Sequence, residues 1–146
     1  MVSIGPPAVD AISRAAKAAA FAESVEHWLA AARERDDISY LSIYESDNVV
    51  GQIFLHDTDQ QAMTSLVGYH LFEPRFRDRG IGTAALNLLL ELVRSQTNLE
   101  RLFIITSDDN AASQRVARKC GFVYVGPSRE DPAHGMVFEL TVTRPT

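Results

Sequence analysis

The stretch RFRDRGIGTAAL, residues 75–86, constrains this chain more than any other part of its sequence. It follows a β-type run and opens a very apolar segment that continues to about residue 96 with helical spacing. Glycines at a helix start let backbone N–H groups approach a ligand closely, and the helix dipole favours negative charge there. Arg75, Arg77 and Arg79 add three cations beside it. The segment therefore predicts a phosphate site, better suited to a pyrophosphate than to a single carboxylate.

The rest of the chain reads as a mixed α/β layer around one core. Apolar residues at helical spacing predict two helices, or one bent helix, over 8–20 and 21–32, with Trp28 in the core-facing stripe. Alternating and β-branched runs predict strands at 2–4, 40–44, 49–56, 63–72, 102–105, 122–125 and 136–142. The first three long strands suggest an antiparallel meander. We expect a single domain over residues 1–146.

A second segment, NAASQRVARKCGF at residues 110–122, follows the next strand and predicts another helix. Asn110 stands where that helix begins and is a favoured N-cap residue. Gly121 can end the helix in a left-handed conformation.

Together the two segments resemble the signatures of the GNAT superfamily of N-acetyltransferases. The spacing Arg77-x-x-Gly80-x-Gly82 looks like that superfamily's pyrophosphate loop, and the Asn-headed helix closing in Gly-Phe looks like its other motif. Val67-Gly68-Tyr69 and Asn110-x-x-Ser113 are most similar to the ribosomal-protein N-terminal acetyltransferase branch. The resemblance implies a mixed, mostly antiparallel sheet of about six or seven strands flanked by about four helices.

The same resemblance implies acetyl transfer from acetyl-CoA to a primary amine, either a protein N-terminus or a small molecule. The strand end near Leu71 and Phe72 would serve the thioester and the pantetheine arm. The backbone from Arg79 to Thr83 would hold the pyrophosphate. The residues expected to bind the cofactor are Leu71, Phe72, Arg77, Arg79, Gly80, Ile81, Gly82, Thr83, Asn110 and Ser113.

The catalytic residues of such enzymes are only partly matched here. The family often carries a tyrosine one turn before the Gly-Phe, to protonate the departing thiolate, and this chain has Ala117 there. Ser113 lies four residues earlier on the same helix face and is the candidate acid, although a helix serine also often bonds a preceding carbonyl.

The general base is left open by the sequence. Relatives often have a glutamate where this chain has Leu66. His70 lies beside the thioester strand and is the preferred base, with His56, Glu45 and water as alternatives. Cys120 and His134 are assigned to packing and to a turn.

Charge and cysteine content exclude several other classes of protein. The formal charge of −5 argues against a general nucleic-acid binder and is compatible with a cationic substrate. One cysteine can form no internal disulfide, and no spacing predicts a metal site. No apolar run is long enough to span a bilayer, so we expect a cytoplasmic protein with no membrane partner. The sequence leaves open whether the chain forms a homodimer.

Two other functions fit parts of the sequence. Gly80-x-Gly82-x-x-Ala85 with Asp108 is a permitted form of the dinucleotide fingerprint of NAD-dependent oxidoreductases, although too few residues follow it to complete a doubly wound sheet. The missing tyrosine and glutamate motivate a non-catalytic module that binds acyl-CoA.

Overall fold

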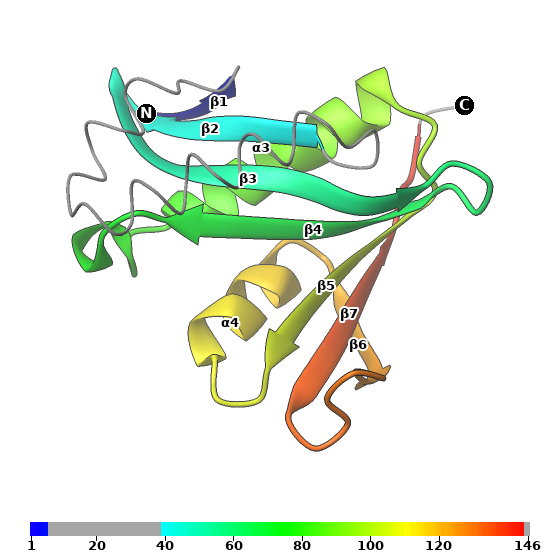
Figure 1. Cartoon of the computed structure of the whole chain (residues 1–146). Helices are drawn as coiled ribbons and strands as arrows, with labels where there is room; N and C mark the ends of the chain where they lie inside the picture. The colour runs from blue at the N-terminus through cyan, green and yellow to red at the C-terminus, as the bar shows by residue number, and fades with distance from the viewer. Residues whose placement is uncertain (6–38, 145–146) are drawn as a thin grey trace.

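A computed structural model describes residues 1–5 and 39–144, and these form one seven-stranded sheet with two α-helices (Figure 1). The strands are β1 (Val2–Gly5), β2 (Ser39–Glu45), β3 (Asn48–Asp59), β4 (Thr64–Leu71), β5 (Arg101–Ser107), β6 (Val123–Pro127) and β7 (Gly135–Thr141). The helices are α3 (Ile81–Gln96) and α4 (Ala111–Lys119), with a 3-10 turn η1 (Pro74–Phe76) after β4. The helices expected over 8–20 and 21–32, including Trp28, lie outside the described residues.

The strand order β1-β2-β3-β4-β5-β7-β6 confirms a mixed and mostly antiparallel sheet. The first four strands form an antiparallel meander; β2, β3 and β4 were predicted to do so from their patterns, and β1 adds a fourth strand. The pair β4–β5 is parallel, and β7 lies between β5 and β6 and runs antiparallel to both. The short first strand occupies the edge beside β2, with Ile4 opposite Ile43.

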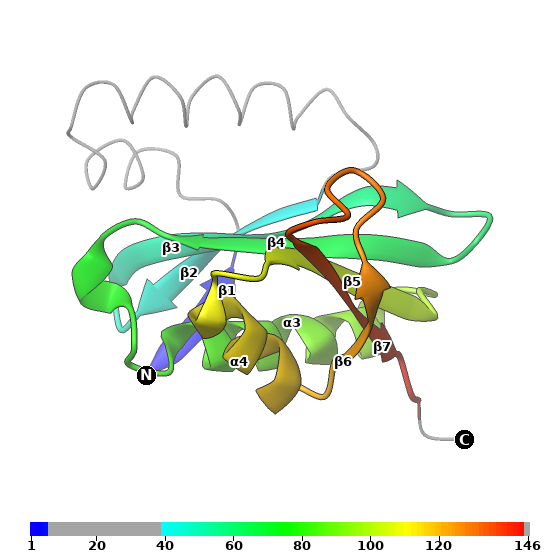
Figure 2. The same ribbon diagram turned by 90° about the horizontal axis from the view of Figure 1, so that it is seen from below.

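Both described helices cover the same face of the sheet (Figure 2). The inward side of α3 is an apolar stripe of Leu86, Leu89, Leu90 and Val93, each at most 3% exposed. This stripe packs against inward residues of the strands, including Ile53 and Leu102. The core therefore lies between the sheet and α3. None of the described helices is long and apolar enough to cross a membrane.

One strand is longer than its sequence pattern predicts. The polar residues after His56 were expected to end the third strand, yet β3 continues to Asp59. Its register with β4 shifts between His56 and Asp59, and Asp57 has a φ of 49°. Such a bulge lets the strand continue through a position that cannot pair. The Thr58 hydroxyl is hydrogen-bonded to that of Ser65 at 2.8 Å, which ties the extension to β4.

Candidate active site

The site begins where the two parallel strands separate. The pairing of β4 with β5 covers Thr64 to Leu66 against Arg101 to Phe103, and then the strands diverge (Figure 1). Residues 67–71 of β4 and 104–106 of β5 line opposite walls of a cavity of about 590 Å³. Beyond Leu66 the facing strand edges no longer form a described ladder, so their backbone groups can bond an extended ligand as a strand would.

The N-terminus of α3 opens into the same cavity. Gly80 adopts the left-handed conformation, with a φ of 77°, which costs glycine little and turns the chain sharply into the helix. The residues that follow, Ile81, Gly82 and Thr83, line the cavity. Their N–H groups belong to the first turn, which has no intrahelical partners and contains no acidic residue. Free N–H groups at a helix start of this kind are a common binding element for anions.

The three arginines of the loop do not act together. Arg77 lines the cavity. Arg75 pairs with Glu73 at 2.6 Å, with its guanidinium 4.6 Å from the centre of the Phe76 ring.

Arg79 donates to the Glu45 carboxylate at 2.9 Å, so this candidate cofactor residue and this candidate base are bound to each other. Neither Arg79 nor Phe72 belongs to the cavity lining found among the described residues. Of the three arginines expected beside the helix, the cavity lining found among the described residues thus includes Arg77.

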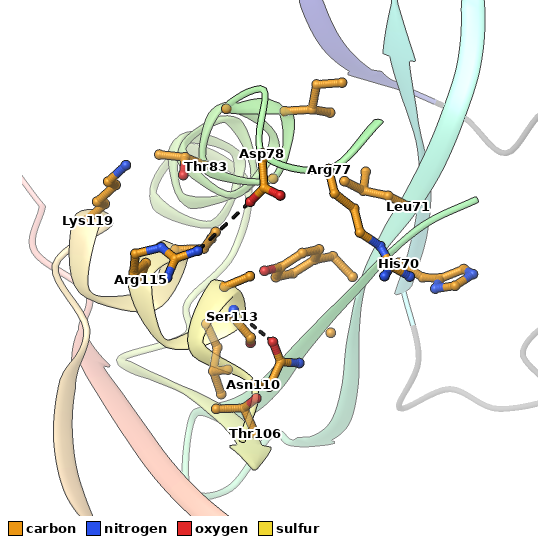
Figure 3. A pocket seen from close by; sticks show the side chains of 18 of the residues that line it. His70, Leu71, Arg77, Asp78, Thr83, Thr106, Asn110, Ser113, Arg115 and Lys119 are labelled. Atoms are coloured by element: carbon orange, nitrogen blue, oxygen red, sulfur yellow. Dashed lines mark hydrogen bonds and ion pairs between the residues drawn. The ribbon is translucent and has the colours of Figure 1, made fainter. Parts of the chain in front are cut away.

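Two cations from α4 line the cavity, whereas Arg75 and Arg79 of the loop do not belong to the described lining. Arg115 and Lys119 line the cavity opposite Thr83 (Figure 3). The Arg115 guanidinium lies 3.9 Å from the Asp78 carboxylate, a contact between the middle of α4 and the loop that precedes α3. The sequence reasoning missed both residues, although their spacing of four on a helix places them on one face.

The start of α4 is fixed to the end of β5 by side-chain hydrogen bonds. Asn110 caps the helix as predicted, because its Oδ1 accepts the Ser113 N–H at 3.1 Å. The Gln114 side-chain amide donates to the backbone carbonyls of Ser107 and Asp108 at 3.1 and 3.2 Å. These contacts hold Ser113 at the cavity wall.

The other end of α4 is closed as its sequence predicts. Gly121 has a φ of 93°, and the Phe122 N–H donates to the Ala117 carbonyl at 3.0 Å. Ala117 is fully buried in the core. The Cys120 thiol is buried and lies 3.6 Å from the Thr83 carbonyl, and burial raises its pKa. This cysteine therefore packs the two helices together, as expected.

The two candidate catalytic side chains lie on opposite faces of β4. Alternate residues of a strand point to opposite faces, and Tyr69 packs against the core on the helix side. Its neighbour His70 therefore points to the other face, where its ring lies edge-on to the Phe72 ring with the two ring centres 5.9 Å apart. Ser113 comes from α4 on the helix side, so the two candidates reach the cavity from different sides (Figure 3).

The surroundings of His70 favour its neutral form. Burial lowers its pKa below the ordinary value of 6.5, and the positive charge of Arg77 lowers it further. Figure 3 shows the Arg77 side chain extending toward His70. A neutral imidazole can accept a proton at neutral pH.

The remaining candidates lie away from the cavity. His56 is hydrogen-bonded to Asp57 at 2.7 Å, beside the β3 bulge. His134 lies 3.3 Å from Asp108 in an exposed turn, where that hydrogen bond raises its pKa. Leu66 occupies the last paired position before the strands separate. Within the described ranges, no three His, Cys, Asp or Glu side chains gather as metal ligands would.

Comparisons with known proteins agree with this geometry. The model of the GNAT acetyltransferase domain family matches residues 6–123. The chain belongs to this family. A prophage-derived uncharacterised N-acetyltransferase of Bacillus subtilis, YokL, is 25% identical over 111 residues, which are 75% of this chain and 61% of that relative. The matched region thus spans less than two thirds of that curated relative.

Solved GNAT structures share the fold at low sequence identity. The ribosomal-protein acetyltransferase RimL, in complex with coenzyme A, superposes with a TM-score of 0.81 at 17% identity, covering 97% of this chain and 94% of RimL. A spermidine N-acetyltransferase from Vibrio cholerae, in complex with CoA and spermine, gives 0.78 at 11% identity, covering 97% and 95%. The ribosomal-protein enzymes expected from the motifs are thus among the structural neighbours of this GNAT protein.

Proposed function

We propose that this GNAT protein transfers the acetyl group of acetyl-CoA to a primary amine by direct attack within a ternary complex. The observation that carries the proposal is the cavity between β4 and β5, with an exposed helix N-terminus at one end. An acyl-CoA combines an extended chain of amides with phosphates, and the cavity supplies a binding element for each part.

The residues present fit such a ligand. The first-turn N–H groups of α3 and the cations Arg77, Arg115 and Lys119 suit the phosphates. The diverging strand edges suit the pantetheine amides, which can bond to backbone groups as an added strand does. The acetyl thioester would then lie near residues 69–71, between His70 on one side and Ser113 on the other.

Most of the catalysis expected from this arrangement is positioning. Holding the two reactants in a productive geometry can remove about 7 to 11 kcal/mol of the barrier to a bimolecular reaction. An alkylammonium must lose a proton before it can attack, and neutral His70 is the proposed acceptor. Ser113 is the proposed donor to the departing sulfur. RimL and the spermidine enzyme suggest a protein N-terminus or a polyamine as acceptor classes.

Binding and transfer test the proposal separately. Acetyl-CoA at a hundredfold excess over its dissociation constant stabilises a protein by about 2.7 kcal/mol, so thermal melts should rise with acetyl-CoA or CoA and not with NAD. Transfer of labelled acetyl groups should then be followed across N-terminal peptides, polyamines and small amines. A rise with NAD and none with either CoA species would overturn the proposal.

The second candidate is a module that binds acyl-CoA without turning it over. The buried Ala117 at the usual tyrosine position, together with Leu66, favours it. Saturable CoA binding with no acetyl transfer to any amine in the panel would support this alternative. The NAD-dependent alternative needs a doubly wound sheet of parallel strands. Among the described strand pairings, β4–β5 alone is parallel and the others are antiparallel, which disfavours this alternative.

A further inference from the structure

One acidic side chain lies in the wall of a cavity that is otherwise rich in cations. Asp78 belongs to the loop between η1 and α3, and it is the single carboxylate among the described residues that line the cavity. Arg77, Arg115 and Lys119 supply positive charge to the same lining. A carboxylate at a site suited to phosphates repels the ligand that its neighbours attract, so its presence calls for an explanation.

The Asp78 carboxylate is directed at one of these cations. Its Oδ1 lies 3.9 Å from Nη2 of Arg115, and Figure 3 shows the two side chains extending toward each other from the loop and from α4. Asp78 also stands two residues before Gly80, the N-cap of α3, and the dipole of a helix favours negative charge near its start. Two features that attract a phosphate, a guanidinium and a helix N-terminus, therefore already attract this carboxylate.

The backbone of Asp78 has a conformation that few residue types accept. Its φ of 58° is left-handed, a region that non-glycine residues adopt rarely and that Asp and Asn tolerate best. Residues held in such conformations cluster at ligand sites. Asparagine suits the same backbone and has nearly the same shape as aspartate, so it can replace the charge without changing the loop.

The contact between Asp78 and Arg115 is weak enough to exchange. The two side chains are 80% and 59% exposed, and exposed ion pairs contribute little to stability. A guanidinium binds a phosphate through two parallel hydrogen bonds, which is stronger than one contact with a carboxylate at 3.9 Å. A phosphate entering the cavity would therefore displace Asp78 from Arg115 and would then lie close to the displaced carboxylate.

Such competition has a use in a reaction whose substrate and product share their phosphates. Acetyl-CoA and CoA differ only at the sulfur, so every contact to the phosphates binds the product as firmly as the substrate. Uniform binding of this kind lowers the KM without speeding the chemical step, and it delays the departure of the product. A carboxylate that weakens phosphate binding shortens that delay.

We propose that Asp78 competes with the phosphates of the cofactor for Arg115 and thereby speeds the release of CoA. The inference rests on the proposed function. In the free protein the carboxylate pairs with Arg115. When a phosphate binds, the guanidinium changes partner, and the repulsion between phosphate and carboxylate lasts until CoA leaves. Asp78 thus sets how long the cofactor stays bound and leaves the rate of acetyl transfer itself unchanged.

Asp78→Asn tests the competition, because it removes the charge and suits the left-handed backbone. We expect CoA and acetyl-CoA to bind about threefold to tenfold more tightly, since exposed ion pairs and repulsions are each worth only a few fold. The gain should appear in the dissociation rate of CoA, measured by stopped-flow displacement at low salt. It should shrink at about 0.5 M salt, where exposed charges are screened. Glu91→Gln is the matched control, because Glu91 is exposed on α3 outside the described lining and its loss changes the net charge equally.

The Arg115→Ala background tests whether Asp78 acts through Arg115. There, Asp78→Asn should change CoA affinity by less than about twofold, because the shared partner is gone. Asp78→Gly also suits a φ of 58° and should reproduce the gain of Asp78→Asn in the wild-type background. Thermal melts establish that each variant is folded. In Asp78→Asn the KM for acetyl-CoA and the inhibition constant of CoA should fall together, with the wild-type rate in single-turnover transfer.

Three results would overturn the inference. A wild-type dissociation rate of CoA in Asp78→Asn would remove Asp78 from product release. An equal gain in the Arg115→Ala background would show that Asp78 repels phosphates directly and does not compete for Arg115. A slower single-turnover rate would place Asp78 in the chemical step.

Failure of the proposed function looks different from failure of this inference. A wild-type protein that binds CoA and transfers no acetyl group would contradict the proposed transfer, while the effect of Asp78→Asn on CoA binding would still be measured. A wild-type protein that binds neither CoA nor acetyl-CoA would contradict both.

Discussion

At the scale of single residues, charge near the phosphate loop is divided by pairing. Arg75 and Arg79 are bound to Glu73 and Glu45, whereas Arg77 lies in the cavity wall. Exposed ion pairs such as these contribute little to stability, but they fix where each guanidinium points. The direction of each side chain therefore decides which arginine can reach a ligand.

Arg77→Ala should weaken acetyl-CoA binding, and Arg75→Ala should not. A charge-assisted hydrogen bond contributes roughly 1.5 to 3 kcal/mol, so we expect a loss of about tenfold or more for Arg77→Ala. Titration calorimetry at low salt measures both variants, which have the same change in net charge. Equal losses would show that the overall charge of the loop, and not the direction of Arg77, attracts the ligand.

The lowered pKa of His70 predicts a pH dependence. Only the neutral imidazole accepts a proton, so turnover at saturating acetyl-CoA should fall as pH decreases through a pKa below 6.5. Arg77→Ala removes one cause of the depression and should move this midpoint upward, with burial still keeping it low. His70→Gln should abolish the step. A step that persists unchanged in His70→Gln would assign it to the amine substrate or to solvent.

At the scale of elements, α4 combines a structural start with a functional face. The Asn110 cap and the two Gln114 hydrogen bonds fix its first turn to β5. Ser113, Arg115 and Lys119 then share the surface that lines the cavity. The Asn110 cap can be predicted from the sequence, and by fixing where α4 begins it sets which residues of the helix face the cavity.

Asn110→Ala should cost about 1 kcal/mol of the free energy of unfolding, because the Ser113 N–H loses its side-chain acceptor. Urea denaturation measures the loss. Asn110→Asp is the matched control: it keeps an acceptor and suits the helix dipole, so it should keep its stability. Its negative charge beside the phosphate-binding cavity should nevertheless weaken CoA binding. Equal stability of wild type and Asn110→Ala would contradict a role for the cap.

At the scale of the whole molecule, the separation of β4 from β5 creates the site. Helices α3 and α4 both lie on one face of the sheet at this gap (Figure 2), and antiparallel strand pairs flank it on either side. The gap exposes backbone groups that a continuous sheet would pair. A ligand that bridges it would complete the sheet.

Hydrogen exchange tests this description. Amides in residues 67–71 and 104–107 that face the gap should exchange quickly in the free protein and become protected by acetyl-CoA. Amides of β3, which pairs with β2 on one side and β4 on the other, should change little and serve as the internal control. Protection spread evenly over the sheet would indicate global stabilisation without binding between the strands.

The sequence by itself determined the local structures and their order. Spacing of apolar residues gave the helices at 81–96 and 111–119 to within a residue or two, and Asn110 and Gly121 marked the ends of the second. The glycine loop with its arginines indicated an anion site at a helix start. These features depend on neighbours within a few positions, so they can be read along the chain.

Only the tertiary structure decided which side chains meet. It directed Arg77 into the cavity while Arg79 paired with Glu45, 34 positions earlier in the chain, and it added Arg115 and Lys119. It placed the His70 side chain on one side of β4 and Ser113 of α4 on the other side, and it brought the Tyr69 ring against Gly82. These outcomes depend on strand register, helix packing and the divergence of two parallel strands. Such contacts join residues far apart in the chain, and no local pattern encodes them.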